Sequence, residues 1–334
     1  MRDWLVTFVQ KFSDYCQLLK MLSNFIFKII NLFPLLFLKT FSNFKFFQNQ
    51  YFKKERSFAI RSYFTTTIKI LRNLNFDNNI IISPKNGNFI ETDDIRLSFE
   101  KFNRHLKSIG SALNEGSYCK RFFQKINLEP EVIIDIGANV GEISLFLNKN
   151  FPNAKIYALE PSSENFKVIS KNIRSQSFDT DKIILKKIAI TDTNGILPIT
   201  CGLQAENTTL SSLIDKKVLT EKVDSKTLLQ FIKAEKIKAV DFIKIDIEGA
   251  EPLLIEDLKK CKNIVKSYLI EFSIKSKIID VHKLLRIMFE NNYKAYTKEN
   301  LKKILIFQEA EETLNQQFKS GFRAVDLFFV RENH

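Results

Sequence analysis

Apolar and polar positions follow a repeating order from Leu128 to the end of the chain. Short apolar runs alternate with longer segments in which apolar positions recur at helical spacing. The apolar runs, which predict β-strands, cover residues 132–136, 155–159, 183–190, 241–247 and 267–272. Continuous apolar strands between helices are typical of a parallel sheet that helices cover on both faces. The pattern therefore predicts an α/β fold for residues 128–334.

Less regular patterns flank these strands. Two further apolar runs, at residues 302–308 and 322–330, show no helix-length periodicity between them, so we expect an antiparallel hairpin that closes the sheet. Upstream, residues 61–127 predict a connector with a short hairpin that turns at residues 85–87. A loop and a helix that ends near Asn127 complete this connector.

Residues 1–60 differ from the rest of the chain in composition. They hold 12 of the 32 Phe residues, and nine Lys or Arg against three Asp or Glu. Early apolar positions recur at helical spacing, which predicts a helical extension. The apolar run at residues 21–41 is interrupted by Lys28 and Pro34, which disfavours a spanning helix without excluding it. A membrane-surface anchor and a helical cap, packed on the main domain or on a second subunit, both remain open.

Charge and cysteine content narrow the functional classes. The 334 residues carry a formal net charge of +13, which suggests an anionic partner such as nucleic acid, a membrane surface or a phosphorylated substrate. The four cysteines form no CxxC pair and the three histidines are scattered, so no zinc site or dense disulfide framework is predicted. A reducing, cytoplasmic setting is the simplest interpretation.

A glycine turn follows the first predicted strand. Asp135 ends that strand, and Gly137, Asn139 and Gly141 lie in the turn that leads into a helix. Such a turn lets a ligand approach the backbone and exposes the free N–H groups of the helix start. A dinucleotide fingerprint would place a third glycine where this chain has Glu142, whose charge would oppose a pyrophosphate. The turn therefore favours a ligand without a diphosphate, and Asp135 suits a cationic group on it.

The second predicted strand also ends in an acidic residue. Glu160 follows Asp135 by 25 residues, and Pro161 sets the turn after it. A carboxylate at this position can accept hydrogen bonds from the hydroxyls of a ribose. Alone, Glu160 could equally neutralise the next helix. Together with the glycine turn, it predicts a nucleoside site.

A third motif surrounds the predicted strand at residues 241–247. Lys244 and Asp246 share one strand face, and Lys244 needs a buried partner, either Asp246 or Glu271. Glu248 follows in the loop. Glu251 opens the next helix, where the helix dipole is an adequate structural reason for an acidic residue. A purely structural ion pair between Lys244 and Asp246 remains an alternative to a catalytic role.

These motifs resemble a known family. The run D-I-G-A-N-V-G, at residues 135–141, and A-L-E-P, at residues 158–161, resemble the first two motifs of class I S-adenosylmethionine-dependent methyltransferases. The run D-F-I-K-I-D-I-E-G-A-E, at residues 241–251, resembles the signature of the FkbM family of methyltransferases. The resemblance covers roughly residues 128–330. It implies a Rossmann-like, seven-stranded, mostly parallel sheet with an antiparallel last strand, and S-adenosylmethionine as cofactor.

The resemblance also implies roles for particular residues. The cofactor-loop positions of the family correspond to Asp135, Gly137, Asn139 and Gly141, and its ribose ligand corresponds to Glu160. Two positions depart from the usual family pattern. Leu229 stands where an Asp is frequent, and Ser273 after Phe272 stands where a histidine is frequent. These departures concern the substrate pocket more than the methyl donor.

Methyl transfer from a sulfonium is an in-line displacement, so the acceptor must be held close and on axis. A hydroxyl acceptor must also lose a proton, which a carboxylate can take. Asp246 and Glu248 are the first candidates for this base, and Glu271 is the next, with Lys244 as a catalytic neighbour. We predict no metal site, although Mg²⁺ held by Asp246 and Glu248 stays open.

The sequence gives partial information on the acceptor. The [DN]-P-P-[YF] signature of amino-methyltransferases is absent after the strand at residues 241–247, and no Pro-Cys nucleophile appears, which argues against nucleic acid. The family resemblance points to a hydroxyl of a sugar, glycan or other natural product. The basic residues 1–60 suggest peripheral contact with the inner membrane face. A non-catalytic scaffold with a methyltransferase fold is the main alternative, and Glu142 disfavours a dinucleotide-dependent oxidoreductase.

Overall fold

The computed structural model describes residues 81–83, 89–91, 96–98, 115–200, 209–210 and 220–332. The predictions for residues 1–60 and for the turn at residues 85–87 lie outside these ranges. Within them, no helix combines the length and the apolar character that crossing a membrane requires.

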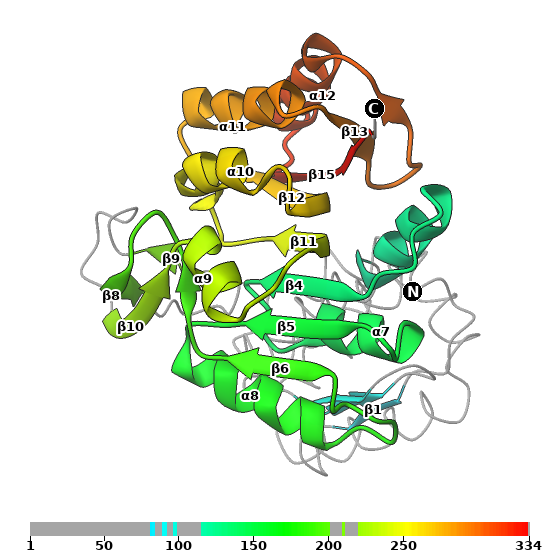
Figure 1. Ribbon diagram of the computed structural model, residues 1–334, viewed down its shortest axis with the longest axis vertical. Coiled ribbons are helices and arrows are strands. Elements are labelled where there is room, and N and C mark those ends of the chain that lie inside the picture. Colours follow the sequence, from blue (N-terminus) through cyan, green and yellow to red (C-terminus); the bar gives the residue numbers. More distant parts are fainter. Residues whose placement is uncertain are drawn as a thin grey trace, which may run out of the picture.

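The described chain is organised around a mixed sheet of eight strands (Figure 1). From one edge to the other its members are β14 (Lys303–Ile304), β13 (Tyr293–Thr297), β15 (Ala324–Arg331), β12 (Val265–Ser273), β11 (Val240–Ile245), β4 (Val132–Ile136), β5 (Lys155–Leu159) and β6 (Ile183–Lys186). Strands β6, β5, β4, β11 and β12 are parallel, whereas β15 is antiparallel to both β12 and β13. This order confirms the predicted Rossmann-like methyltransferase sheet with an antiparallel last strand. The sheet has eight strands rather than seven because β14 pairs with the free edge of β13.

The predicted C-terminal hairpin is wrong. The helix α12 (Phe307–Lys319) separates β14 from β15, and the two strands do not pair with each other. The buried stripe of α12 consists of Ala310 and Leu314, with Phe307 and Phe318 packed beside it. These four positions do follow helical spacing, but polar residues fill the other positions and hide the period. In the same way, the predicted strand at residues 183–190 is two strands, β6 and the short β7 (Ala189–Ile190).

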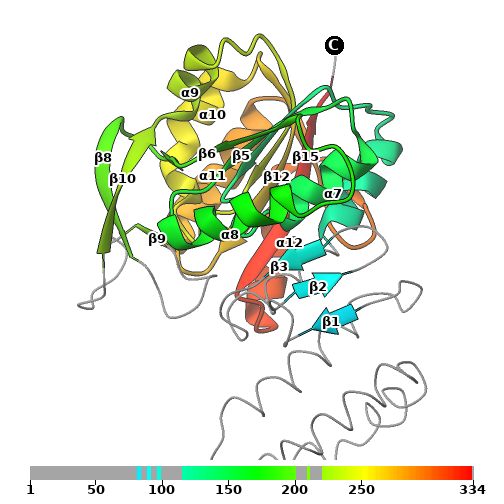
Figure 2. The ribbon, with the colours of Figure 1, turned by 90° about the horizontal axis from the view of Figure 1, so that it is seen from below.

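Helices cover both faces of the sheet (Figure 2). One face carries α7 (Glu142–Asn150) and α8 (Ser163–Arg174), and the opposite face carries α9 (Leu228–Ala234), α10 (Ile255–Cys261) and α11 (Ile278–Glu290). Side chains of β11 alternate between the two cores, as the sequence predicts. Phe242 packs on the side of α7, whereas Ile243 and Ile245 pack on the side of α10.

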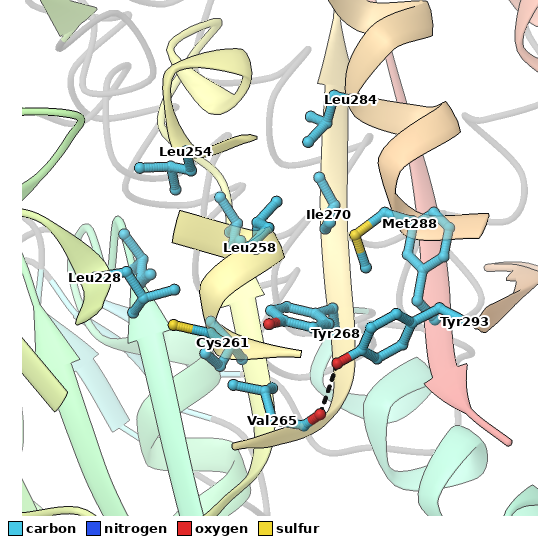
Figure 3. Packing of buried hydrophobic residues seen from close by; sticks show 14 of the residues in the cluster. Leu228, Leu254, Leu258, Cys261, Val265, Tyr268, Ile270, Leu284, Met288 and Tyr293 are labelled. Atoms are coloured by element: carbon cyan, nitrogen blue, oxygen red, sulfur yellow. Dashed lines mark hydrogen bonds between the residues drawn. The ribbon is translucent and has the colours of Figure 1, made fainter. Parts of the chain in front are cut away.

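Large side chains fill the core between the sheet and the helices α10 and α11 (Figure 3). Cys261, Tyr268 and Met288 are fully buried there. A buried tyrosine hydroxyl needs a polar partner. Tyr293 donates its hydroxyl hydrogen to the backbone oxygen of Val265 at 2.6 Å, which fixes β13 against the start of β12.

The connector packs on the same domain. Residues 115–125 form a helix, and the Phe122 ring stacks on Phe328 of β15 with 4.3 Å between centroids. The predicted hairpin is present as β1 (Ile81–Ser83) and β2 (Phe89–Glu91), which pair in antiparallel fashion, and β3 (Arg96–Ser98) extends it. The Ser98 amide donates to Oδ1 of Asn172 on α8 at 2.7 Å. The domain boundary near residue 128 remains a prediction, and the helix before it contributes Cys119, Phe122 and Phe123 to the core of the same domain.

A second small sheet, which the sequence did not predict, lies between β6 and α9 in the chain. Its order is β7, β10 (Thr220–Lys226), β8 (Gly195–Thr200) and β9 (Thr209–Leu210). Ala189, Ile199 and Val223 form its buried cluster. These strands are short and about half of their residues are polar, so the alternation of apolar and polar positions that would predict them is weak.

Candidate active site

The carboxyl ends of β4, β5, β11 and β12 meet at one edge of the main sheet. Ligands bind at this edge in open α/β sheets. Because β15 is antiparallel, its first residues lie at the same edge. The positions that the sequence singled out all lie on these strands or in the loops that follow them: Asp135, Gly137, Asn139, Gly141, Glu160, Pro161, Lys244, Asp246, Glu248 and Glu271.

The glycine turn after β4 fits tightly against its neighbours. Gly137 and Gly141 have φ angles of 80° and 90°, which favour glycine. A Cβ on Gly137 would lie 1.9 Å from the backbone oxygen of Asp246, and a Cβ on Gly141 would lie 2.5 Å from Ile169. The amides of Gly137 and Ala138 both donate to the backbone oxygen of Leu159 at 3.0 Å. The turn therefore touches the ends of β5 and β11 at once and leads directly into α7.

Glu160 is buried beside this turn, with 3% of its surface exposed. Its carboxylate accepts the backbone N–H of Asn139 and of Ser162, each at 2.9 Å, and the Asn165 side chain at 3.4 Å. Burial raises the pKa of Glu160 to about 7, although these hydrogen bonds oppose the shift. The sequence did not predict this bracing of the glycine turn. Since a carboxylate has about four acceptor positions, three donors leave room for about one more.

Lys244 links the ends of β4 and β11. Its ammonium donates to the backbone oxygen of Gly137 at 3.1 Å and lies 3.2 Å from Asp246 Oδ2 and 3.7 Å from Asp135 Oδ1. Burial alone would lower the pKa of Lys244, but the carboxylates of Asp246 and Asp135 hold it well above its usual value. Of the two partners that the sequence suggested for Lys244, the structure shows Asp246 and not Glu271. Asp135, 1% exposed, also accepts the Ser144 hydroxyl at 2.6 Å and lies beneath the turn.

Asp246, Glu251 and Glu271 form a carboxylate cluster beside the turn. One oxygen of each lies within 4.8 Å of the others. Glu251 begins the 3-10 helix η3 (Glu251–Leu254) and is 1% exposed, and burial raises its pKa to about 7. Burial and the negative charges of Asp246 and other nearby carboxylates raise the pKa of Glu271 well above its usual value. Asp246 is partly open to solvent, with 30% of its side chain exposed.

Glu248 lies beside this cluster and has a different partner. Its backbone φ is 58°, and its carboxylate forms an ion pair with Lys275, which follows β12. The next residue, Gly249, approaches Lys275 so closely that a Cβ on it would lie 2.8 Å from the Lys275 Cβ. Glu248 therefore joins the loops after β11 and β12.

A further charged group, which the sequence did not reveal, includes Asp326 of β15, the strand that pairs with β12. Lys298 forms ion pairs with Asp326 of β15 and, at 3.9 Å, with Glu115. Burial raises the pKa of Glu115 to about 8, although Lys298 opposes the shift. The strand register places Asp326 opposite Glu271. The sequence did offer one sign of this group, because Glu271 and Asp326 are each the single acidic residue of an apolar run. Only the pairing of the two strands brings these residues together.

Comparisons with known proteins agree with this geometry. Residues 135–295 match the family model of the methyltransferase FkbM domain, a range that contains all ten singled-out positions. The methyltransferase sdnD of Sordaria araneosa is 33% identical over 79 residues, which are 23% of this chain and 25% of that protein. The chain thus matches about a quarter of the length of this curated relative.

Solved methyltransferase structures are similar at low identity. The METTL16 methyltransferase domain is 15% identical, with a TM-score of 0.43 over 86% of this chain and 96% of that one. A putative O-methyltransferase from Klebsiella pneumoniae is 12% identical, with a TM-score of 0.40 over 66% and 80%. The plantazolicin methyltransferase BpumL, in complex with SAH, is 11% identical, with a TM-score of 0.36 over 69% and 91%.

Proposed function

The chain belongs, through residues 135–295, to the FkbM family of S-adenosylmethionine-dependent methyltransferases, and we propose that it methylates a hydroxyl oxygen of a sugar, glycan or other natural product. One observation carries this proposal. The glycine turn and the loop that presents Asp246 are in direct contact, because only a hydrogen atom fits between Gly137 and the Asp246 backbone oxygen. A donor on the turn would therefore lie beside an accessible carboxylate.

The residues around the turn fit an aminoacyl nucleoside. Gly137 and Gly141 let the turn pack directly against Asp246 and Ile169. The turn leads into the start of α7, where the first backbone N–H groups of a helix can face a ligand. Glu160 has about one acceptor position left for a ribose hydroxyl. Asp135 supplies negative charge beneath the turn, where an ammonium group would be attracted. The bound donor supplies an electrophilic methyl group.

Asp246 is our candidate for the base that takes the proton of the acceptor hydroxyl. It is partly exposed, unlike the buried Glu251, and Lys244 fixes its carboxylate from behind at 3.2 Å. Lys244 is thus a positioning residue for both Asp246 and the turn. Holding the acceptor oxygen in line with the methyl group can itself contribute about 7–11 kcal/mol. Glu271 and Glu248 are the alternative bases on the same edge.

The test has a binding arm and a product arm. Calorimetry with S-adenosylhomocysteine should show saturable binding, and its absence at millimolar ligand would favour the non-catalytic alternative. Mass spectrometry should compare glycans and small metabolites of cells with the wild-type chain, with Asp246→Asn and with no chain. A product heavier by one CH₂ unit is expected with the wild-type chain alone. A methylated nucleic acid in place of a methylated hydroxyl would contradict the proposed acceptor class.

A further inference from the structure

The carboxylates of Asp246, Glu251 and Glu271 lie close enough to share one cation. One oxygen of each is within 4.8 Å of the others. Oxygen ligands at about 2.0–2.6 Å from an ion can be separated by about 4–5 Å when they lie on opposite sides of it. The three separations are therefore compatible with ligands around a single ion.

The neighbouring lysines do not neutralise this cluster fully. Lys244 pairs with Asp135 and Asp246, Lys275 with Glu248, and Lys298 with Asp326 and Glu115. Within the part of the chain that the structure describes, no hydrogen bond or ion pair reaches the Glu271 side chain. Like charges placed together and removed from water are costly unless a counter-charge is present. Among the described residues, these three carboxylates therefore share a single ion-paired lysine, Lys244.

Glu251 gives an independent sign of a missing ligand. Its Oε1 accepts the amides of Ile247 at 2.9 Å and of Gly249 at 3.1 Å, which fixes the carboxylate in one orientation. Its Oε2 is buried and has no hydrogen-bond partner among the described residues. A buried carboxylate oxygen without a partner is costly. The same carboxylate faces Asp246 and Glu271, where a cation would satisfy it.

The chemistry of the donors selects the class of ion. All three are carboxylates, and neither histidine nor cysteine joins the group. Oxygen-only sets suit hard cations rather than zinc or copper. We propose that Asp246, Glu251 and Glu271 bind one hard divalent cation, such as Mg²⁺ or Mn²⁺. The cation would also hold and polarise the acceptor oxygen, a role that rests on the proposed function, whereas the binding itself does not.

Manganese provides a direct probe. The purified full chain, saturated with S-adenosylhomocysteine, is titrated with Mn²⁺ while electron paramagnetic resonance measures the free ion. We expect one bound Mn²⁺ per chain, displaced by excess Mg²⁺. A free-ion signal that the protein leaves unchanged would overturn the proposal.

Two variants and a matched control locate the site. Glu251→Gln and Glu271→Gln should each weaken Mn²⁺ binding by about tenfold or more, since loss of even an outer-shell partner costs about that much. Glu256→Gln removes a carboxylate of α10 that is 67% exposed and paired with Lys259, and it should bind Mn²⁺ like the wild type. Circular dichroism checks folding. If Glu251→Gln does not fold, Glu271→Gln decides alone, and wild-type affinity in it would overturn the assignment.

Failure of the site and failure of the proposed function give different results. Saturable Mn²⁺ binding without any methylated product would contradict the proposed acceptor chemistry and leave the cation site standing. Methylation at full rate in excess chelator, without Mn²⁺ binding, would contradict the cation site alone.

Discussion

The two halves of the candidate site differ in how completely their carboxylates are satisfied. On the side of β4 and β5, Glu160 accepts three hydrogen bonds. Asp135 accepts the Ser144 hydroxyl through Oδ2, and its Oδ1, which has no hydrogen bond among the described residues, lies 3.7 Å from the Lys244 ammonium. On the side of β11 and β12, Glu251 has one satisfied oxygen, and no hydrogen bond or ion pair to the Glu271 side chain appears in the described ranges.

The difference separates a preformed region from an incomplete one. Internal hydrogen bonds fix the side of β4 and β5, which we call the donor side because the proposed methyl donor would bind there. A ligand can therefore bind on this side without rearrangement. On the side of β11 and β12, which we call the acceptor side, three carboxylates share one ion-paired lysine among the described residues, so the proposed cation would complete that side. Variants should therefore damage the first side through geometry and the second through charge.

The largest effect is expected for Gly137→Ala. The new Cβ would overlap the backbone oxygen of Asp246, and the φ of 80° adds strain. We expect a loss of more than about 4 kcal/mol of unfolding free energy in urea, at the upper end for single substitutions. Gly321→Ala is the control, because its φ of 91° is similar and no atom lies within 4 Å. It should cost only about 1 kcal/mol, and equal losses would disprove the tight contact.

Lys244→Met should cost about 3–5 kcal/mol, the usual penalty for removing one partner of a buried ion pair. The variant removes the ammonium group that pairs with both Asp135 and Asp246, and the Gly137 carbonyl loses its hydrogen bond from Lys244. Both sides of the site are therefore disturbed. Lys259→Met, on the surface of α10, breaks an exposed pair and should cost less than about 0.5 kcal/mol. Urea unfolding of both variants measures the difference. Similar stabilities would show that Lys244 does not link the two sides.

Asp246→Asn isolates the acceptor side. As the proposed base, Asp246 should contribute about 100-fold or more to turnover, while the affinity for S-adenosylhomocysteine stays within a few-fold because the donor side is intact. Turnover on the identified acceptor and calorimetry separate the two quantities. Full activity would transfer the role to Glu271 or Glu248.

Glu160→Ala tests the donor side with a smaller expected effect. It removes the hydrogen bond to the Asn139 amide and the proposed ribose acceptor, so the free energy of S-adenosylhomocysteine binding should weaken by about 1–3 kcal/mol. Calorimetry measures this loss. Asp181→Ala, at an exposed carboxylate before β6, serves as a control that should not change affinity. A fall of the same size in both variants would contradict a specific role for Glu160.

The smallest effect is a pH dependence of donor binding. The pKa of Glu160 is about 7 when folded, above its usual value of 4.5, so the buried group is protonated at pH 6 and ionises by pH 8. The raised pKa lowers the free energy of unfolding from pH 4.5 up to about 7, where the unfolded state ionises and the folded group does not. Above that pH the folded group ionises and becomes the better acceptor for ribose hydroxyls. Affinity should therefore rise by up to about tenfold from pH 6 to pH 8. Glu160→Gln should remove the rise, and an unchanged slope would disprove its origin.

The sequence predicted the regular part of the fold well. The runs at β4 and β5 match the observed strands to the residue, because strands buried on both faces are uninterrupted apolar segments. The helix α12 and the sheet around β10 were missed, because their apolar positions are few and widely spaced.

The site was predicted only as far as local motifs reach. Every motif residue lies on one of the predicted strands or in the loop that follows it, since strand ends and glycine turns are local features. Glu251 was explained as a helix-start residue, and its place beside Glu271 depends on how two loops fold toward each other. Asp326 lies opposite Glu271 only through the register of β12 with β15. Such pairings join residues distant in sequence, and no single stretch of chain encodes them.

The position of β15 bears on how the protein matures on the ribosome. This strand follows β13 in synthesis, yet it lies between β12 and β13 in the sheet. In a nascent chain that has emerged only as far as Thr297, β13 has no neighbouring strand to pair with. The Phe122 ring also lacks its stacking contact with Phe328, which has not yet been synthesised. Completion of the core is therefore a late event in translation. Premature termination before residue 324 would leave the edges of β12 and β13 unpaired and exposed, and chaperones would have to shield them.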